Sequence, residues 1–279
     1  MQHADQNWFV IVFEGILVSL IMWKIFGSIR GNLPFIRRIP GLNAIDEAIG
    51  RATEMGRPAI MIPGLSGLDI VGLQALNIFQ YVTRTAARFG SPIRLLLADP
   101  ILFTVAQEVI QDAYRVEGRL DVYDPESVRY VASGQFAFAA GASGIIQREK
   151  AAAVFLMGVF FAESLILAET ANSVGAIQVA GTTMTTQTPF FVAACDYVII
   201  GDEFYAASAY LSREPVALGS LVGQDYAKLA LVAIIIIGCV VFTITGPQLK
   251  GSEPLMYKLF NIGGWDALMQ SIRHLFHKG

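Results

Sequence analysis

Apolar residues form two long runs near the ends of the chain and an alternating pattern between them. The first run, 8–26, has 19 residues, which as a helix reach roughly 28 Å, close to the thickness of a bilayer core. The second, 229–246, has 18 residues and no charge. Both runs are therefore predicted to be transmembrane helices.

Basic residues set the expected orientation of these helices. Lys24, Arg30, Arg37 and Arg38 follow the first run, and no Lys or Arg precedes it. The positive-inside rule then predicts a cytoplasmic central domain, with both termini outside. A cleavable signal peptide would carry its basic residues before the apolar stretch, so we expect an uncleaved anchor.

The central region alternates short apolar strands with amphipathic helices. Strands without polar alternation are typical of a parallel sheet covered on both faces. The sequence therefore predicts an α/β fold, a mostly parallel five-stranded Rossmann-like sheet flanked by two transmembrane helices. The predicted strands are 58–63, 93–98, 152–160, 176–180 and 197–201, with helices at 68–89, 101–117, 135–147, 163–173 and from Pro189.

A third apolar run, 151–168, contains Glu163 and Ser164, so we interpret it as a buried strand followed by a helix. The remaining boundaries follow from these elements. The predicted order is an outer N-terminus at 1–7, a transmembrane helix at 8–26, a juxtamembrane linker at 27–57, the cytoplasmic domain at 58–228, a second transmembrane helix at 229–246, and a tail with an amphipathic helix at 247–279.

Composition narrows the classes of function. The chain is 54% hydrophobic and 15% charged with a net charge of -3, which argues against a nucleic-acid partner. Two cysteines support neither a disulfide framework nor a thiolate metal site. The three histidines lie outside the central region, so a catalytic zinc and a Ser-His-Asp triad are not expected there.

Ligands of open parallel sheets bind beyond the carboxyl ends of the strands. The loops there lack G-x-G-x-x-G and G-x-x-x-x-G-K-[ST], and no cofactor is predicted. Ser66 with Asp69 is interpreted as a capping box rather than a nucleophile. Oxygen ligands for Mg²⁺ or Ca²⁺ are available at four helix starts, although dipole-stabilising carboxylates explain them as well, and no metal is predicted. These four are Asp99, Glu163, Asp202 and Glu203.

A hydroxyl-rich loop, Gly181 to Pro189, could hold an anionic ligand or pack on a partner subunit. If the domain binds a ligand, the expected residues are Ser66, Glu163, Ser164, Thr182, Thr183 and Asp202. Within the first apolar run, Glu14 is an intramembrane polar residue. It could be protonated, bond to another copy of the helix, or lie near the outer interface, and its position six residues after Trp8 favours the interface.

Three segments carry a family resemblance. They read ADPILFTVAQEVIQDAYRVEGRLDVYDPESVRYVASGQFAFAAG, FFAESLILAETANSVGAIQVAGTT and PFFVAACDYVIIGDEFYAASAYLSREPVALGS. Together they resemble a family of prokaryotic membrane proteins known as a domain of unknown function. The resemblance implies a prokaryotic inner-membrane protein with an α/β domain between two membrane helices, and it implies no activity.

Two functions remain open. The first is a membrane-anchored, non-catalytic scaffold that forms a homo-oligomeric ring or array, indicated by the small apolar residues of FAFAAGASGII and FYAASAYL. Its partners would be membrane lipid, copies of itself and other membrane proteins. The alternative is a tethered domain that binds or hydrolyses a nucleotide or another anionic small ligand. The sequence does not decide whether the protein is an enzyme, and the lack of a catalytic signature favours the scaffold.

Overall fold

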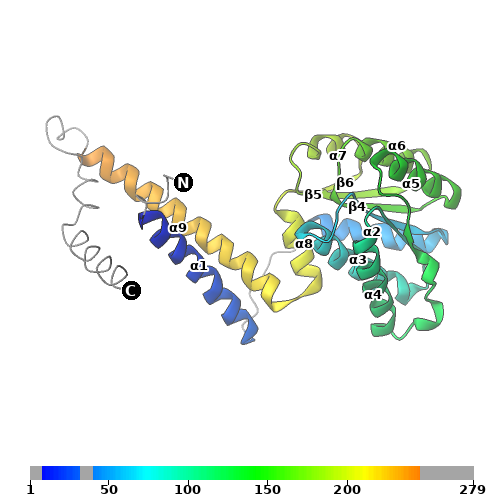
Figure 1. The fold of residues 1–279 in the computed structure, drawn as a ribbon, viewed down its shortest axis with the longest axis horizontal. Helices are drawn as coiled ribbons and strands as arrows, with labels where there is room; N and C mark the ends of the chain where they lie inside the picture. Colours follow the sequence, from blue (N-terminus) through cyan, green and yellow to red (C-terminus); the bar gives the residue numbers. More distant parts are fainter. Residues whose placement is uncertain (1–7, 32–39, 246–279) are drawn as a thin grey trace, which may run out of the picture. The chain divides into compact units, whose positions relative to one another are not determined.

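The computed structural model describes residues 8–31 and 40–245 (Figure 1). Two compact units are present: Ile21–Gly223 forms one, and the other joins Met1–Leu20 to Gln224–Gly279. The expected outer N-terminus at 1–7 and the amphipathic helix in the tail at 247–279 lie outside the described residues.

A six-stranded parallel sheet forms the centre of the larger unit, in the order β3-β2-β1-β4-β5-β6. The predicted α/β class and parallel sheet are confirmed, but the predicted number of five strands is wrong. The sixth strand is β3, which has only three residues, and of these Val128 alone is buried. So short a strand leaves no apolar run to detect. The strands are β1 (Ala59–Gly64), β2 (Ile93–Leu97), β3 (Val128–Tyr130), β4 (Ala153–Val159), β5 (Ile177–Thr182) and β6 (Tyr197–Ile200).

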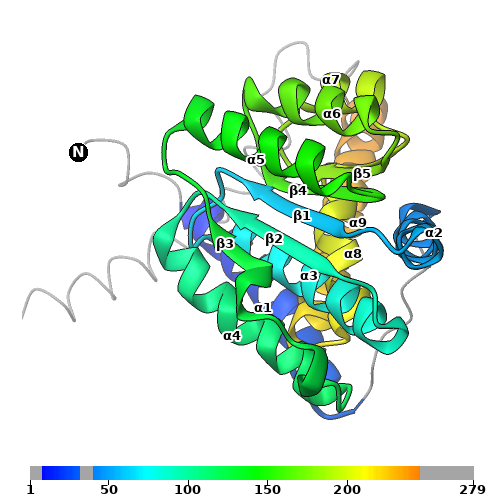
Figure 2. The same ribbon diagram turned by 90° about the vertical axis from the view of Figure 1, so that its right-hand side faces the viewer.

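Helices cover both faces of the sheet (Figures 1 and 2). One face carries α2 (Pro40–Met55), α3 (Ile70–Phe89), α4 (Pro100–Val116) and α8 (Glu203–Ser212). The other carries α5 (Gln135–Glu149), α6 (Glu163–Ser173) and α7 (Thr188–Ala194). Two 3₁₀ turns, η1 (Leu120–Val122) and η2 (Pro125–Ser127), precede β3.

Because helices cover both faces of the sheet, the strands are apolar at successive positions. In β1, Ala59 and Met61 pack toward the α3 side, whereas Ile60 and Ile62 pack toward the α5 side. Because successive side chains of a strand point to opposite faces, both sets must be apolar. The run at 151–168 follows the same rule: it forms β4 and the first turns of α6, as expected from Glu163.

Helix α2 extends the core beyond the expected domain boundary. The sequence analysis assigned 27–57 to a linker, but Pro40–Met55 is helical and contributes side chains to the core. The signal was present in the sequence, since Ile45, Ala48, Ile49 and Ala52 follow helical spacing. All four side chains are fully buried.

The small-residue segments expected to drive self-association are used inside the chain. In α5, Phe138, Ala139 and Ala142 are buried against the sheet, and a Cβ at Gly141 would lie 2.4 Å from Val131 Cγ1. In α8, Phe204, Ala207, Ser208 and Ala209 are buried. These segments therefore supply mainly the domain's own packing, although Phe136 at the start of α5 is 66% exposed.

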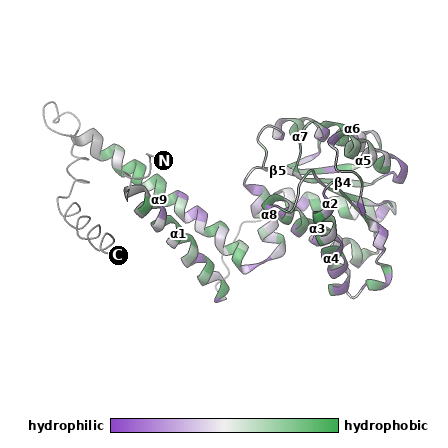
Figure 3. Ribbon diagram, in the orientation of Figure 1, coloured by the Kyte–Doolittle hydropathy of each residue, from purple (hydrophilic) through white to green (hydrophobic). Residues whose placement is uncertain are grey.

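Two further helices lie at the ends of the described chain, α1 (Trp8–Ile29) and α9 (Pro215–Thr245). Among the described residues one helix, Pro215–Val240, is long and apolar enough to cross a membrane. Figure 3 shows the hydrophobic residues along it. Four consecutive isoleucines of α9 are each more than half exposed, so this chain does not cover them: Ile234, Ile235, Ile236 and Ile237.

A G-x-x-x-G motif brings α1 and α9 together within the larger unit. A Cβ at Gly219 would lie 2.8 Å from Ile25 Cα, and one at Gly223 would lie 2.9 Å from Ile21 Cα. The two helices therefore run antiparallel with their backbones in close approach. Small residues at this spacing are a common packing device between membrane helices.

This contact yields a stability prediction for the full chain in detergent micelles. Gly223→Ala should destabilise the protein by about 1–3 kcal/mol, because the new methyl group must push α1 away. The matched control is Gly238→Ala on the same helix, where a Cβ meets nothing within 4 Å. Denaturant titrations measure the difference, and equal stability of the two variants would contradict the packing role.

Candidate functional site

The sheet order reverses direction between β1 and β4, and this is where open α/β sheets form their ligand crevice. Here the last residues of the two strands lie close together, and Gly64 pairs with Val159 in the β1–β4 ladder. A Cβ at Gly64 would clash with Val159 O, and a Cβ at Gly158 would clash with Pro63 O. Both glycines have positive φ, +66° and +150°. The ends of β1 and β4 are therefore held backbone to backbone, with no room for a side chain between them.

Ser66 holds this junction. Its hydroxyl donates to Pro63 O at 2.7 Å and accepts from Val159 N at 2.9 Å, and the residue is 1% exposed. The predicted capping box is wrong, because Asp69 caps α3 instead, accepting from Gly72 N at 2.6 Å. Because the Ser66 hydroxyl both donates to and accepts from backbone groups, it links the two strand ends and is not available as a nucleophile.

Glu163 lies at the start of α6 and is fully buried. Its Oε1 accepts from Phe161 N at 2.9 Å, and its Oε2 accepts from Gln135 Nε2 at 2.6 Å. The carboxylate therefore joins the loop after β4 to the start of α5. Gln135 was not among the predicted site residues, because its partner lies 28 residues away.

Ser164 extends this cluster toward the hydroxyl-rich loop. Its hydroxyl lies 2.8 Å from Phe161 O and 3.0 Å from Gln187 Oε1. Glu163, Ser164 and Gln187 thus form a connected polar network between the loops that follow β4 and β5. The buried polar side chains at this edge therefore have hydrogen-bond partners within the chain.

The other predicted ligand residues are spread along the same edge. Thr182 is buried, and its Oγ1 accepts from Met184 N at 3.1 Å. Thr183 is half-buried, and Asp202 is exposed at the start of α8. Gly201 N donates to Thr182 O at 3.2 Å, which brings the ends of β5 and β6 together.

Metal ligation is not favoured at this edge. Asp99 caps α4 by accepting from Leu102 N at 2.7 Å, as the helix-start explanation predicted. Within residues 8–31 and 40–245, no group of three or more His, Cys, Asp or Glu side chains is arranged to hold a metal ion. Glu203 and Asp202 stand exposed at the start of α8.

Cys195 is the cysteine of the α/β domain. Its Sγ lies 3.5 Å from Gln178 Oε1. Burial, helped by the nearby Asp196 carboxylate, raises the pKa of the Cys195 thiol to about 12. The thiolate is the reactive form, so Cys195 is inert near neutral pH.

Large apolar side chains surround this edge, and the sequence analysis missed them because they come from several separate loops and first helical turns. They are between 43% and 69% exposed and come from the loops after β1 and β4 and from the first turns of α3, α4, α5 and α7: Leu68, Ile70, Ile101, Phe136, Phe161 and Phe190. We call these six residues the apolar rim. A rim of this kind is typical of an interaction surface.

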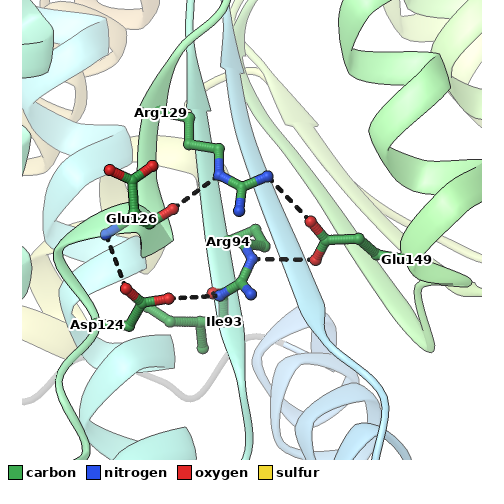
Figure 4. Close-up of polar contacts among 6 residues, drawn as sticks. All are labelled: Ile93, Arg94, Asp124, Glu126, Arg129 and Glu149. Carbon is green, nitrogen blue, oxygen red and sulfur yellow. Dashed lines mark hydrogen bonds and ion pairs between the residues drawn. The ribbon is translucent and has the colours of Figure 1, made fainter.

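Charged residues gather instead at the opposite edge of the sheet (Figure 4). Glu149, at the end of α5, lies 3.0 Å from Arg94 Nε and 3.1 Å from Arg129 Nη1. Asp124 lies 3.6 Å from Arg94 Nη1. This cluster ties β2 and β3 to α5 and η2.

A family model described as "Domain of unknown function (DUF6754)" matches residues 2–252. The chain belongs to this family. The match spans both α1 and α9 as well as the α/β domain, so the DUF6754 family includes the whole described architecture. Comparison with curated proteins gives no match.

The Glu163 network predicts different outcomes for two substitutions. Glu163→Ala should destabilise the full chain by about 2–4 kcal/mol, because Phe161 N and the Gln135 amide lose their acceptor in a buried position. Glu163→Gln should cost less than about 1 kcal/mol, because Gln135 can rotate its amide to match.

Thermal or denaturant unfolding in detergent measures both variants, and hydrogen exchange at the start of α6 locates the change. If the two substitutions cost the same, the carboxylate has a role other than accepting these two hydrogen bonds.

Proposed function

We propose that this protein is a membrane-anchored scaffold whose α/β domains associate head to tail, the apolar rim of one copy contacting the opposite sheet edge of the next. The observation that carries the proposal is exposed apolar side chains at both edges. In addition to the rim, a second set of apolar side chains lies at the opposite edge of the sheet, at the ends of α2, α3 and α4 and in η1. These side chains are 39% to 63% exposed: Met55, Phe89, Val116 and Leu120. We call these four residues the opposite patch.

The chemistry of the rim favours a protein partner over an anionic metabolite. No Lys or Arg occurs in the loops that form it, so a phosphate would meet no cation there. Ser66 and Glu163, which stand at this edge, are hydrogen-bonded within the chain. The loops are 63–70, 98–101, 130–136, 159–163, 181–190 and 200–203.

Charge supports a second copy as the occupant. Asp202 and Glu203 are exposed beside the rim, whereas Arg148 and Lys150 are exposed at the other edge of the sheet. The other edge also exposes Asp121 and Glu126, so both signs are present there, and the acidic side chains beside the rim can meet the basic side chains of the next copy. Because the two contacting surfaces differ, the interface is heterologous, and it closes into a ring or continues as a filament.

The membrane anchor completes the proposal. We infer that α9 spans the bilayer and that α1, packed against Gly219 and Gly223, is a second span. Lys24 and Arg30 then lie on the domain side, which supports a cytoplasmic domain with both termini outside. Glu14 is exposed on α1 and would lie near the outer interface. Anchored copies share one membrane plane, so their α/β domains can contact one another.

The oligomeric state tests the scaffold. Full-length protein extracted in native lipid discs should be oligomeric, and Phe136→Glu or Phe89→Glu should reduce it mainly to monomers by placing a charge in the interface. The control Val192→Glu alters a side chain that is 57% exposed but lies outside the rim and the opposite patch. Native mass spectrometry gives the subunit count. Monomers alone in the wild type would refute the proposal.

Cross-linking tests the head-to-tail geometry. In a background with Cys195→Ala and Cys239→Ala, Phe136→Cys and Phe89→Cys are made as separate variants. We expect disulfide-linked dimers on oxidation of the mixed variants and few in either variant alone. Dimers of Phe136→Cys with itself would instead indicate a two-fold interface between rims.

A further inference from the structure

A cavity of about 230 Å³ opens at the amino ends of β2 and β3, on the edge opposite the apolar rim. The end of α3, the start of β2, Tyr114 of α4 and the segment around η2 line it. No predicted site residue lies there. Its polar side chains come from three separated segments of the chain, so no sequence motif predicts it.

Ser91 and Ser127 are among the residues that line this cavity, and each carries a buried hydroxyl without a partner. Ser91 is 6% exposed and Ser127 is 2% exposed, and the Oγ atom of neither has a hydrogen-bond partner within the described part of the chain. Buried hydroxyls of native proteins are normally bonded. Both Oγ atoms are inaccessible in these rotamers, and a rotation about χ1 would turn them toward the cavity. Two such hydroxyls beside one cavity favour a polar occupant.

The charges around the cavity balance, which selects against an ionic occupant. Arg94 lines the cavity, and its guanidinium is matched by Glu149 at 3.0 Å and by Asp124 at 3.6 Å, while Arg129 also pairs with Glu149 (Figure 4). Two guanidinium groups thus face two carboxylates. A bound anion or cation would have to displace one of these pairs.

Tyr114 is a third hydroxyl-bearing residue in the lining of the cavity. Its side chain is nearly buried and its ring packs on Tyr123, with the ring centroids 5.5 Å apart. Burial raises the pKa of Tyr114, so its hydroxyl remains neutral at physiological pH. The apolar remainder of the lining, Ala87, Pro92 and Ile93, suits the carbon skeleton of a small molecule.

We propose that this cavity binds a small uncharged polar molecule bearing hydroxyl or amide groups, which bonds to Ser91 Oγ and Ser127 Oγ. At roughly 30 Å³ for each water-sized group, the volume accepts about seven or eight non-hydrogen atoms, the size of a three- or four-carbon polyol. The site is separate from the apolar rim. It lies on the same edge as the opposite patch, so the proposed head-to-tail contact would adjoin it, but its polar bonding does not require that contact.

The test uses the full chain in lipid nanodiscs, with empty nanodiscs as background, and ligand-observed saturation-transfer NMR. The probes are glycerol and erythritol, with acetate and benzene as ionic and apolar comparisons and with phosphate, which has no observable protons, tested as a competitor of the polyol signal. We expect saturable binding of a polyol that weakens at least tenfold in Ser91→Ala and in Ser127→Ala. The matched control is Ser208→Ala, which removes a buried unpartnered hydroxyl outside the cavity.

Binding should persist in Phe136→Glu, so failure of the scaffold proposal would leave this result intact. The absence of saturable polyol binding, as expected for a cavity that holds solvent only, would overturn the proposal. So would tighter binding of acetate, phosphate or benzene, or unchanged polyol binding in both serine variants. Because each serine loses only an unbonded hydroxyl, the variants should fold, which thermal unfolding checks.

Discussion

The close approach of Gly64 and Gly158 joins the two halves of the sheet. Strands β1 to β3 wind in one direction and β4 to β6 in the other, and at their junction a single methyl group would strike a carbonyl oxygen. The hydrogen bonds of Leu65 N to Val159 O and of Val159 N to Ser66 Oγ close the same point. This contact has a structural consequence, because it fixes the two strand ends at the point where sheets of this order reverse direction.

Much of the fold followed from the sequence because both faces of the sheet are covered. Continuous apolar strands such as 153–159, and proline after a capping aspartate at Asp99, are local signals that need no tertiary information. Strand β3 escaped because its pairing with β2, not its composition, makes it a strand. Helix α2 was assigned to a linker although its spacing was helical, because its partners lie far along the chain.

The candidate site was harder to predict than the fold. Glu163, Ser164 and Ser66 were recognised as residues at strand ends, but their hydrogen-bond partners, Gln135, Gln187 and Val159, are set by tertiary packing. A buried carboxylate bonded on both oxygens and an available one look alike in sequence. Exposure, which decides between a core residue and a docking residue for Phe136 or Ile70, likewise depends on the folded neighbours.

Helix α2 also constrains the order in which the protein can assemble during synthesis. It is made directly after α1, yet its partners include Tyr197, whose hydroxyl donates to Glu47 across 150 residues, and Ile199, which lies against Gly41. Its packing partners β4 and β5 are also made late, so until they and β6 leave the ribosome only β1 and α3 can cover the apolar face of α2. Part of that face therefore stays exposed during most of synthesis and is buried only when the sheet is completed.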